Sequence, residues 1–249
     1  MLREDRQDQI LHLLNTKGKV IASELCEELN VSEDTIRRDL RELSARGLIR
    51  RVHGGALPIA PSHTKYEERE HVLVEEKKLV AKKAASLIKN GQLILLDGST
   101  TASHMVQYFP ADLQCTVITN SPRIALSLSS FEKVDTIMIG GAIFKNSEVC
   151  TGSLAIEALS RFRPDICFLG IYCIHPDEGI TDLDLEEAYM KQKMIEISSQ
   201  VAGLVTTNKL DRLSEYMVTK TDSLTHLITE LDPSCQRLSK YKTGSITVL

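Results

Sequence analysis

The chain has 249 residues, of which 42% are hydrophobic and 26% charged, so it can bury a core, and its length favours one large domain or a small domain joined to a medium one. The formal net charge of −4 argues against a protein that coats nucleic acid indiscriminately. No segment approaches the roughly 18 consecutive apolar residues of a membrane span, the N-terminus is too charged for a secretory signal, and the cysteines and histidines show neither CxxC nor HExxH spacing. We therefore expect a cytoplasmic protein without a membrane partner, a metal site, a cofactor or a disulfide framework.

Two helices are predicted before residue 30. Apolar side chains at helical spacing predict the first over residues 3–16, and Gly18 is expected to end it. The second covers residues 24–29, with Ser23 as its N-cap. A tight turn at residues 30–31 then leads to the next helix.

A third, basic helix follows this turn. Ser32 is a favourable N-cap, and Glu33 and Asp34 place negative charge at the positive end of the helix dipole. An apolar stripe with helical spacing must face the core and consists of Ile36, Leu40 and Leu43. The side chains left on the outer and flanking faces are Thr35, Arg37, Arg38 and Arg41. Helix, short turn and capped basic helix predict a helix-turn-helix, whose second helix enters the DNA major groove.

The segment after Gly47 is predicted to form a two-stranded wing. Apolar and basic side chains alternate on both sides of His53, Gly54 and Gly55, which suit a tight turn. Arg50, Arg51 and His53 would then approach the phosphates of DNA.

A solvated helix face is the alternative explanation of the arginines, since charge runs on helices usually serve no other purpose. Local charge argues against it: residues 1–30 carry four basic and six acidic side chains, net −2, whereas residues 31–57 carry six basic and four acidic, net +2. The cap, the turn and the wing beside the arginines favour DNA binding.

The segment ELCEELNVSEDTIRRDLRELSARGLIRRVHGGA closely resembles the winged helix-turn-helix signature of the DeoR family of bacterial transcriptional regulators. The shared elements are the S-x-x-T-I-R-R-D-L core and the R-x-H-G-G-A wing. The resemblance implies that the residues facing DNA are Ser32, Thr35, Arg37, Arg38, Arg41, Arg51, His53 and Gly54.

A linker is predicted over residues 58–74, between a DNA-binding domain at 1–57 and a second domain at 75–249. The linker holds two prolines and mixed charge without an apolar period. Within it, Tyr66-x-x-Arg69 is similar to an aromatic-x-x-Arg element that joins the two domains in the DeoR family, which implies partial packing.

The second domain is predicted to be an α/β domain with a mostly parallel sheet covered on both sides. A helix over residues 75–90, with Leu79 on its inner side and Gly91 as its stop, precedes the buried strand LILLD. Further apolar runs are CTVIT, VDTIMI, ICFLGIY, VAGLVT and LTHLIT. The helices between them are predicted at 101–109, 122–129, 153–162 and 185–200.

In such a sheet ligands gather beyond the carboxyl ends of the strands, so the residues after each apolar run are the candidate site. Asp97 can accept from sugar hydroxyls, a helix start with Ser99 suits a phosphate, and Lys209 could neutralise that phosphate. The other candidates at strand ends are Thr100, Thr101, Asn120, Gly141 and Gly170. The alternative is that each loop merely caps a helix, which the convergence of several loops at one edge weakens.

Glu187 and Lys191 are four residues apart on one predicted helix. A surface ion pair worth roughly 0.3–0.5 kcal/mol explains them without a function. A place in the effector site is the other interpretation.

This half also resembles the sensor domain of the DeoR family along nearly its whole length, through motifs such as LLDGSTT, VITNS, DICFLG and E-x-x-x-K-x-x-M-I. That domain is similar in fold to sugar-phosphate isomerases, which implies a phosphorylated sugar or related metabolite as effector. Two positions depart from the family: Ser99 displaces the middle glycine of D-x-G-T-T, and Thr206 replaces an aspartate that precedes the lysine.

We therefore predict a DNA-binding transcriptional regulator, a repressor of a carbohydrate-metabolism operon controlled by a phosphorylated sugar. Its partners would be double-stranded operator DNA and a second copy of itself, in a homodimer or homotetramer. One alternative is a sugar-phosphate isomerase with an added DNA-binding module, which needs a positioned base such as Asp97 or Glu187. Another is a second domain that only sets the oligomeric state.

Overall fold

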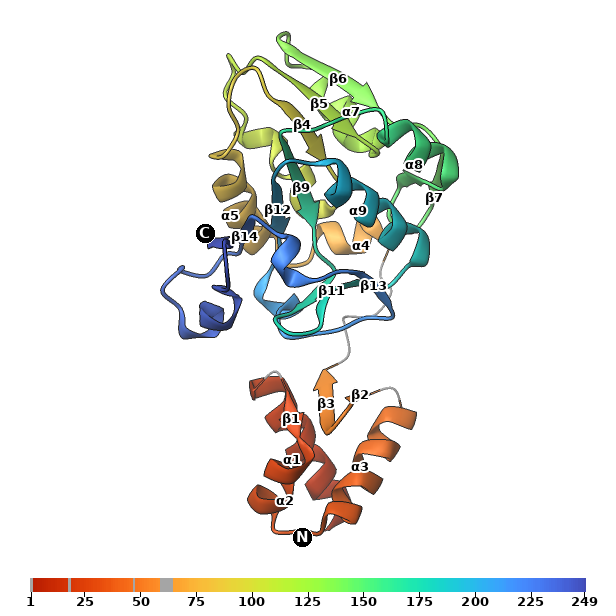
Figure 1. Cartoon of the computed structure of the whole chain (residues 1–249), viewed down its shortest axis with the longest axis vertical. Coiled ribbons are helices and arrows are strands. Elements are labelled where there is room, and N and C mark those ends of the chain that lie inside the picture. Colours follow the sequence, from red (N-terminus) through yellow and green to blue (C-terminus); the bar gives the residue numbers. More distant parts are fainter. Residues whose placement is uncertain (1, 18, 47, 59–64) are drawn as a thin grey trace.

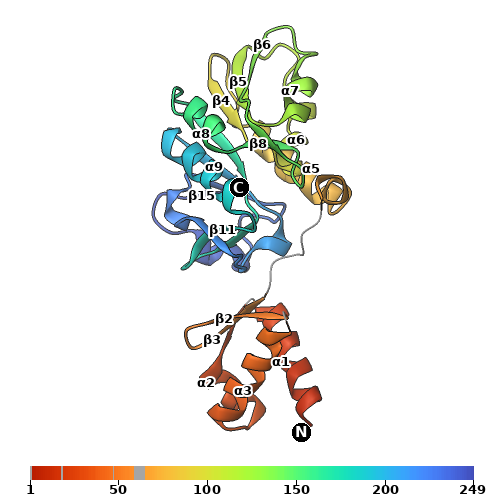
Figure 2. The same cartoon turned by 90° about the vertical axis from the view of Figure 1, so that its right-hand side faces the viewer.

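The computed structural model describes residues 2–17, 19–46, 48–58 and 65–249. Along the chain, a small helical domain with a short sheet is followed by a larger α/β domain (Figures 1 and 2). The expected stop at Gly18 lies outside the described residues, as do residues 59–64 of the expected linker.

The first domain has three helices and a three-stranded antiparallel sheet of order β1-β3-β2. Its elements are α1 (Arg3–Lys17), β1 (Val20–Ile21), α2 (Ala22–Leu29), α3 (Glu33–Ala45), β2 (Ile49–Val52) and β3 (Gly55–Pro58). The helix-turn-helix and the wing are thus confirmed, but the wing gains a third strand. The third strand is β1, which pairs with β3 of the hairpin so that Val20 lies opposite Ala56. Its extended backbone satisfies hydrogen-bonding groups on the open edge of β3.

The start of α2 corrects the prediction of a Ser23 cap. Ser23 lies inside the first turn of α2, and Ile21 occupies the N-cap position without a side-chain bond. The backbone N–H of Ala22 donates to the Gly54 carbonyl at 2.8 Å. The first backbone N–H of α2 is therefore satisfied by the neighbouring strand and not by a serine hydroxyl.

Helix α3 follows its sequence signals closely. Ser32 is the N-cap, and its Oγ accepts from the Thr35 backbone N–H at 3.4 Å. The predicted stripe is buried in the core of the domain, with exposed fractions of 0% for Ile36, 3% for Leu40 and 0% for Leu43. Burial of this stripe fixes the rotation of α3 and leaves its arginines outside.

Residues 65–74 belong with the larger domain. Helix α4 (Tyr66–Glu70) packs Tyr66 to 1% exposure, and α5 (Val74–Ala85) follows after a turn at Leu73, whose φ is +52°. Helix α5 ends five residues earlier than predicted, and Leu79 is 51% exposed, so its expected inward orientation is wrong. The buried residues of α5 include Val80, Ala81 and Ala84, whose spacing defines a different face.

The larger domain is built on a seven-stranded parallel sheet of order β15-β14-β12-β9-β4-β5-β6. All six predicted strands are present as β4 (Leu93–Leu96), β5 (Cys115–Thr119), β6 (Val134–Met138), β9 (Ile166–Gly170), β12 (Val201–Leu204) and β14 (His226–Ile228). The seventh, β15 (Thr247–Val248), has only two residues and left no periodic signal in the sequence. The predicted α/β class and parallel sheet are confirmed.

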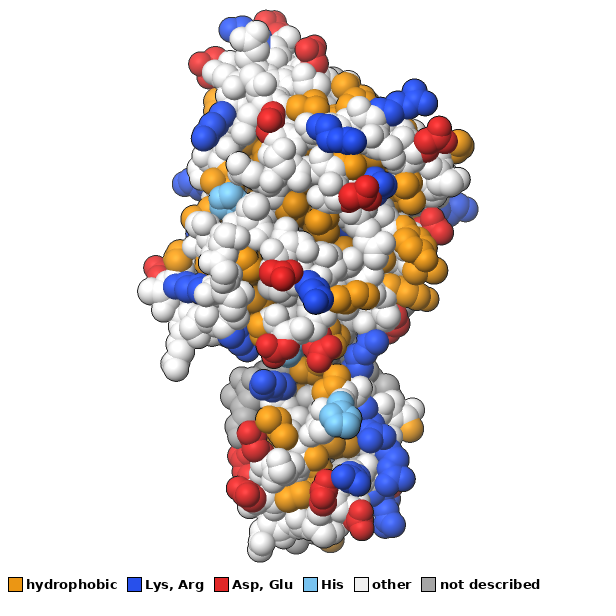
Figure 3. Space-filling view, in the orientation of Figure 1, with side chains coloured by type: hydrophobic (Ala, Val, Ile, Leu, Met, Phe, Trp, Pro, Cys, Tyr) orange, Lys and Arg blue, Asp and Glu red, His pale blue; other side chains and the backbone are white. Residues whose placement is uncertain are grey.

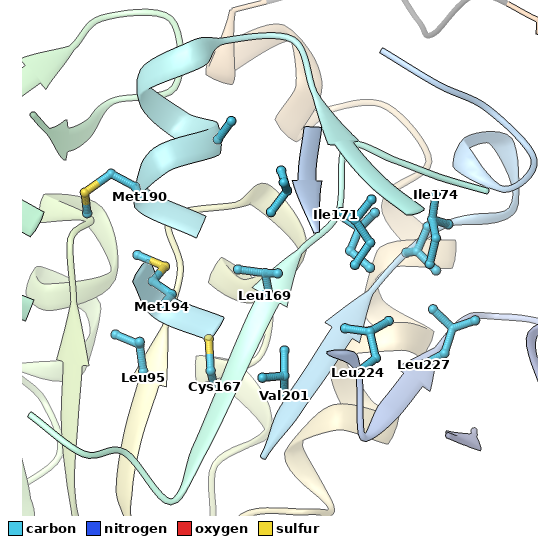
Figure 4. Packing of buried hydrophobic residues seen from close by; sticks show 14 of the residues in the cluster. Leu95, Cys167, Leu169, Ile171, Ile174, Met190, Met194, Val201, Leu224 and Leu227 are labelled. Atoms are coloured by element: carbon cyan, nitrogen blue, oxygen red, sulfur yellow. The ribbon is translucent and has the colours of Figure 1, made fainter. Parts of the chain in front are cut away.

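Helices cover both faces of this sheet. One core cluster joins the sheet to α8 (Ser153–Leu159) and α9 (Leu185–Ile197). Figure 4 shows Met194 of α9 beside Leu95 and Cys167, with Met190 further along the same helix. A second cluster joins the opposite face to α5, α6 (Thr100–Ser103), η1 (Val106–Tyr108) and α7 (Pro122–Leu128). Strands buried on both faces explain the continuous apolar runs in the sequence.

Smaller elements surround the carboxyl edge of the sheet. They are the hairpin β7 (Ala142–Phe144) and β8 (Val149–Thr151), the sheet of β10 (Cys173–His175), β11 (Gly179–Asp182) and β13 (Tyr216–Thr219), and the short helices η2 (Thr207–Lys209), η3 (Thr221–Ser223) and η4 (Gln236–Tyr241). These elements were not predicted, because each is too short to show a period. They position several of the side chains described below.

Candidate DNA-binding face and ligand pocket

The arginines of α3 form an exposed basic face on the first domain. Figure 3 shows Lys and Arg side chains gathered along one edge of this domain, over α3. Arg37 pairs with Glu33 at 2.6 Å, and Arg41 Nε donates to the Arg37 carbonyl at 3.3 Å. Arg38 is exposed and has no partner among the described residues, so its guanidinium is available to a ligand.

The wing places further polar groups beside this face. His53 and Gly54 form the turn between β2 and β3, and Gly54 has a φ of +81°, which an L side chain rarely adopts. Arg51 is exposed on β2. A Cβ at Gly55 would lie 2.0 Å from the Val20 carbonyl oxygen, so glycine is needed there for β1 to pair with β3.

A buried polar contact holds α3 against α1. Asp39 is 1% exposed, and Arg6 Nε donates to its Oδ2 at 2.5 Å while Gln7 Nε2 donates to its Oδ1 at 3.2 Å. The aspartate of the R-R-D-L segment therefore positions the helix and does not face solvent. Hydrogen bonds to a buried carboxylate stabilise this orientation of α3.

The second candidate site is a pocket at the carboxyl edge of the parallel sheet, enclosing about 590 Å³ with its open mouth included. Loops after β4, β5, β9 and β12 contribute to its wall, together with α4, α9 and β8. Its charged lining consists of three cations and three carboxylates, namely Arg69, Lys191, Lys209, Asp97, Asp182 and Glu187.

Two of the cations differ in their surroundings. Lys191 Nζ donates to Asp182 Oδ2 at 2.5 Å; burial opposes its charge, but the carboxylates of Asp182, Glu187 and Asp97 outweigh burial and raise the pKa. Lys209 Nζ donates to the Ile171 carbonyl at 2.9 Å and forms no ion pair with any described residue. Burial, followed by the charges of Lys191 and Arg69, lowers the pKa of Lys209 to about 8. The pocket therefore lacks an anion beside Lys209.

The carboxylates are held by the protein to different degrees. Asp97 Oδ1 accepts from the Ser99 N–H and Oδ2 from the Gly170 N–H, both at 2.8 Å, so it ties two loops together. Glu187 accepts from Ser147 Oγ at 2.9 Å, and burial raises its pKa while Lys191 opposes this shift. Both carboxylates retain acceptor capacity toward the hydroxyl groups of a ligand.

Asn120 adds an unsatisfied acceptor to the wall of the pocket. Its Nδ2 donates to the Cys150 carbonyl at 2.9 Å, whereas its Oδ1 is buried without a hydrogen-bond partner. A buried polar atom without a partner costs free energy, which a ligand hydroxyl or a water would recover.

The two departures from the family pattern have local consequences. Ser99 serves as the N-cap of α6, since its Oγ accepts from the Ala102 N–H at 3.1 Å. Thr206 Oγ1 donates to Asn208 Oδ1 at 2.6 Å, and none of the described carboxylates forms an ion pair with Lys209. A Cβ at Gly170 would lie 2.1 Å from Ser99 Cβ, so this glycine permits the close approach of the loops after β9 and β4.

The fold brings together eight of the ten side chains predicted for the effector site. Those lining the pocket are Asp97, Ser99, Thr100, Asn120, Gly170, Glu187, Lys191 and Lys209. Thr101 is buried within α6, and Gly141 packs against β8 and α8, so neither lines the pocket. The surface ion pair expected for Glu187 and Lys191 is wrong, because Lys191 is 9% exposed and pairs with Asp182.

Sequence reasoning missed Arg69 and Asp182 as lining residues of this pocket. The sequence placed Arg69 only in a linker element, and Asp182 is the last residue of β11, a strand too short to be recognised. The signal that could have found Arg69 was its place in the Tyr66-x-x-Arg69 element, which implied that the linker is partly packed.

Among the described residues, no cluster of three or more histidine, cysteine or carboxylate side chains could hold a metal ion. Within the same residues, every helix is too short or too polar to span a bilayer.

Comparison with known proteins assigns both halves of the chain. A family model described as a DeoR-like helix-turn-helix domain matches residues 6–61, and one described as a DeoR C terminal sensor domain matches residues 73–231. The chain is 35% identical over 237 residues to the HTH-type transcriptional repressor GlcR of Bacillus subtilis (strain 168), covering 94% of this chain and 91% of the relative. It is 33% identical over 213 residues to the glycerol-3-phosphate regulon repressor of Escherichia coli (strain K12), covering 85% and 84%. Among solved structures, ribose 5-phosphate isomerase A from Neisseria gonorrhoeae matches with a TM-score of 0.40 and 9% identity, covering 54% of this chain and 52% of that one.

Proposed function

The chain belongs to the DeoR family of transcriptional regulators, and from this premise we propose that it is a repressor of a carbohydrate-metabolism operon whose DNA affinity is set by a phosphorylated sugar. The observation that carries the proposal is the placement of Lys191, Lys209 and Arg69 in one pocket with carboxylates and a free amide oxygen. Such a lining suits a ligand that has an anionic group and several hydroxyls.

The anionic group would be held at Lys209. This ammonium group is charged near neutral pH, has no carboxylate partner among the described residues, and lies beside two further cations. A phosphate there would replace the missing counter-ion, while Asn120 Oδ1 and Glu187 would accept from sugar hydroxyls.

On the DNA side, we propose that Ser32, Thr35 and the arginines of α3 contact operator DNA, with the wing on the phosphate backbone. The N-terminal part of α3 would enter the major groove. A symmetric operator calls for a homodimer or homotetramer. We also propose that the protein works in the cytoplasm, where its operator DNA would lie. Light scattering of the purified chain would measure its oligomeric state.

The effector must bind the DNA-incompetent arrangement more tightly than the competent one, or it shifts no equilibrium. A thermal-shift screen of pentose, hexose and triose phosphates, followed by DNA binding with and without the hit, tests this. At 100 times its dissociation constant a ligand should stabilise the protein by about 2.7 kcal/mol. If no phosphorylated sugar raises the melting temperature, the second domain is a scaffold and the proposal fails.

DNA contacts are tested on sequences selected from a random pool. Arg38→Ala should weaken binding and relax base preference, whereas Arg51→Ala should weaken binding to all sequences and lower the salt slope by about one. Arg161, two residues beyond the end of α8, has a side chain 77% exposed on the other domain, so Arg161→Ala is the matched control. Unchanged affinity in both variants of the first domain would contradict this assignment.

The isomerase alternative is not favoured, because the relatives that match most of the chain are transcriptional regulators. Turnover of pentose or hexose phosphates above an Asp97→Ala control would reinstate it.

A further inference from the structure

Arg69 differs from the other two cations of the pocket because it lies on α4, close in the chain to the DNA-binding domain. Lys191 lies on α9 and Lys209 on η2, both inside the larger domain. Arg69 lies on α4, the first described element after the wing, separated from β3 by only seven residues of chain. A ligand that contacts Arg69 therefore contacts the segment leading to the DNA-binding domain.

Helix α4 contacts the tip of the β7–β8 hairpin, residues 145–148, and also α6. The Tyr66 N–H donates to the Asn146 carbonyl at 2.7 Å, and Arg69 Nη2 donates to Ser147 Oγ at 3.0 Å. The Arg123 guanidinium lies 5.0 Å from the centre of the Tyr66 ring and pairs with Glu148. The same hairpin supplies Val149 and Thr151 to the pocket wall, so α4 and the pocket share one support.

Among the residues that the structure describes, the Arg69 guanidinium uses one of its five N–H donors, in the hydrogen bond to Ser147. Its partner Ser147 donates in turn to Glu187, at 2.9 Å. The present partner of Arg69 is thus a neutral hydroxyl, which is a weaker partner for a guanidinium than an anion. An anion between Lys191 and Lys209 would compete with Ser147 for this guanidinium.

We propose that Arg69 is a ligand-binding residue that moves its guanidinium from Ser147 to the anionic group of the effector, so that binding in the pocket repositions α4 and hence the attachment of the DNA-binding domain. This inference rests on the proposed function, since it requires an anion in the pocket. The end of α4 is anchored as well, because Lys77 Nζ donates to the Arg69 carbonyl. The repositioning therefore rotates or shifts the helix without releasing it.

The experiment uses the full chain and inorganic phosphate as probe, with calorimetry for affinity and hydrogen–deuterium exchange for the amides of residues 65–72. In the wild type, phosphate should change exchange in this peptide. Arg69→Gln should bind phosphate about tenfold more weakly or worse, and phosphate should leave the exchange of its α4 unchanged. Arg123→Gln is the matched control: it removes a cation that packs on α4 outside the pocket, and its phosphate affinity should equal that of the wild type.

Ser147→Ala tests whether Arg69 binds the anion or only supports the hairpin. This variant removes the present partner of Arg69 and leaves its guanidinium in place. Its phosphate affinity should be equal to or higher than that of the wild type. A loss as large as that of Arg69→Gln would overturn the inference, because Arg69 would then act only by holding the hairpin. Two other results would also overturn it. One is that Arg69→Gln binds phosphate with wild-type affinity. The other is that phosphate leaves the amide exchange of residues 65–72 unchanged in the wild type.

Failure of the proposed function has a different signature. If the wild type binds neither phosphate nor any phosphorylated sugar, the effector proposal and this inference both fall. If phosphate binds and Lys209→Met abolishes binding while Arg69→Gln does not, only the inference about Arg69 falls. Far-UV circular dichroism of each variant confirms that the fold persists.

Discussion

Raising the pH from 7 to 9 should weaken the binding of a phosphate monoester about tenfold, because Lys209 loses its charge in this interval. Burial, then the neighbouring charges of Lys191 and Arg69, lowers the pKa of Lys209 to about 8. Lys209 is therefore about nine-tenths protonated at pH 7 and about one-tenth protonated at pH 9. A bound anion favours the charged ammonium, so above pH 8 binding must include proton uptake.

The other groups around Lys209 simplify the interpretation. The carboxylates beside Lys191 raise its pKa despite its burial, so it stays charged throughout. Burial raises the pKa of the Cys173 thiol to about 12, above the interval. A phosphate monoester has a second pKa near 6 and is a dianion from pH 7 upward. Lys77 is a competing group, because burial, followed by the charge of Arg69, lowers its pKa to about 8 as well.

The assay is calorimetry of the phosphate monoester found in the screen, at pH 7, 8 and 9, in two buffers that differ in ionisation enthalpy. The difference between buffers at pH 8 should correspond to about half a proton taken up per ligand bound. Lys209→Met should bind weakly and without this pH dependence, whereas Lys77→Met should keep it. An affinity that is constant from pH 7 to 9, or a pH dependence that survives in Lys209→Met, would refute the reasoning.

Three further predictions concern the framework of the two sites. Lys191→Met should lower the free energy of unfolding by about 3–5 kcal/mol, measured in urea, because it leaves the buried Asp182 carboxylate without its cation; adding Asp182→Asn should recover much of this loss. Ser32→Ala should cost about 1 kcal/mol in the same measurement through loss of the α3 cap, and an unchanged midpoint would show that the cap contributes nothing. Gly170→Ala should weaken ligand binding and lower the free energy of unfolding by about 1–3 kcal/mol, since the new Cβ would lie 2.1 Å from Ser99 Cβ. A ligand affinity in calorimetry equal to that of the wild type would disprove the close approach.

Much of the first domain was predictable from its sequence because the signals are local. Residues 32–43 contain the cap of α3, the acidic residues of its first turn and its apolar stripe. Burial of the stripe leaves only the outward face of the helix for Arg37 and Arg38. The Ser23 cap failed because the start of α2 depends on pairing between β1 and β3, which are more than 30 residues apart.

The pocket was predictable only where it depends on sheet topology. Parallel strands bring their carboxyl ends to one edge, so Asp97, Asn120 and Lys209 meet there whatever the details of packing. Gly141 also follows a strand, but it packs against Thr151 of β8 and Ala155 of α8 and does not line the pocket.

By itself the sequence determined the order of elements, the basic helix and wing, and the loops from which a ligand site could be built, because caps, periods and strand ends are properties of neighbouring residues. Only the tertiary structure decided that Lys191 points inward to Asp182, that Lys209 has no carboxylate beside it, and that Arg69 of α4 joins them. The physical reason is that a side chain's charge partner and its burial depend on contacts between distant segments. Those contacts turn a set of polar loops into a pocket with an unbalanced cation.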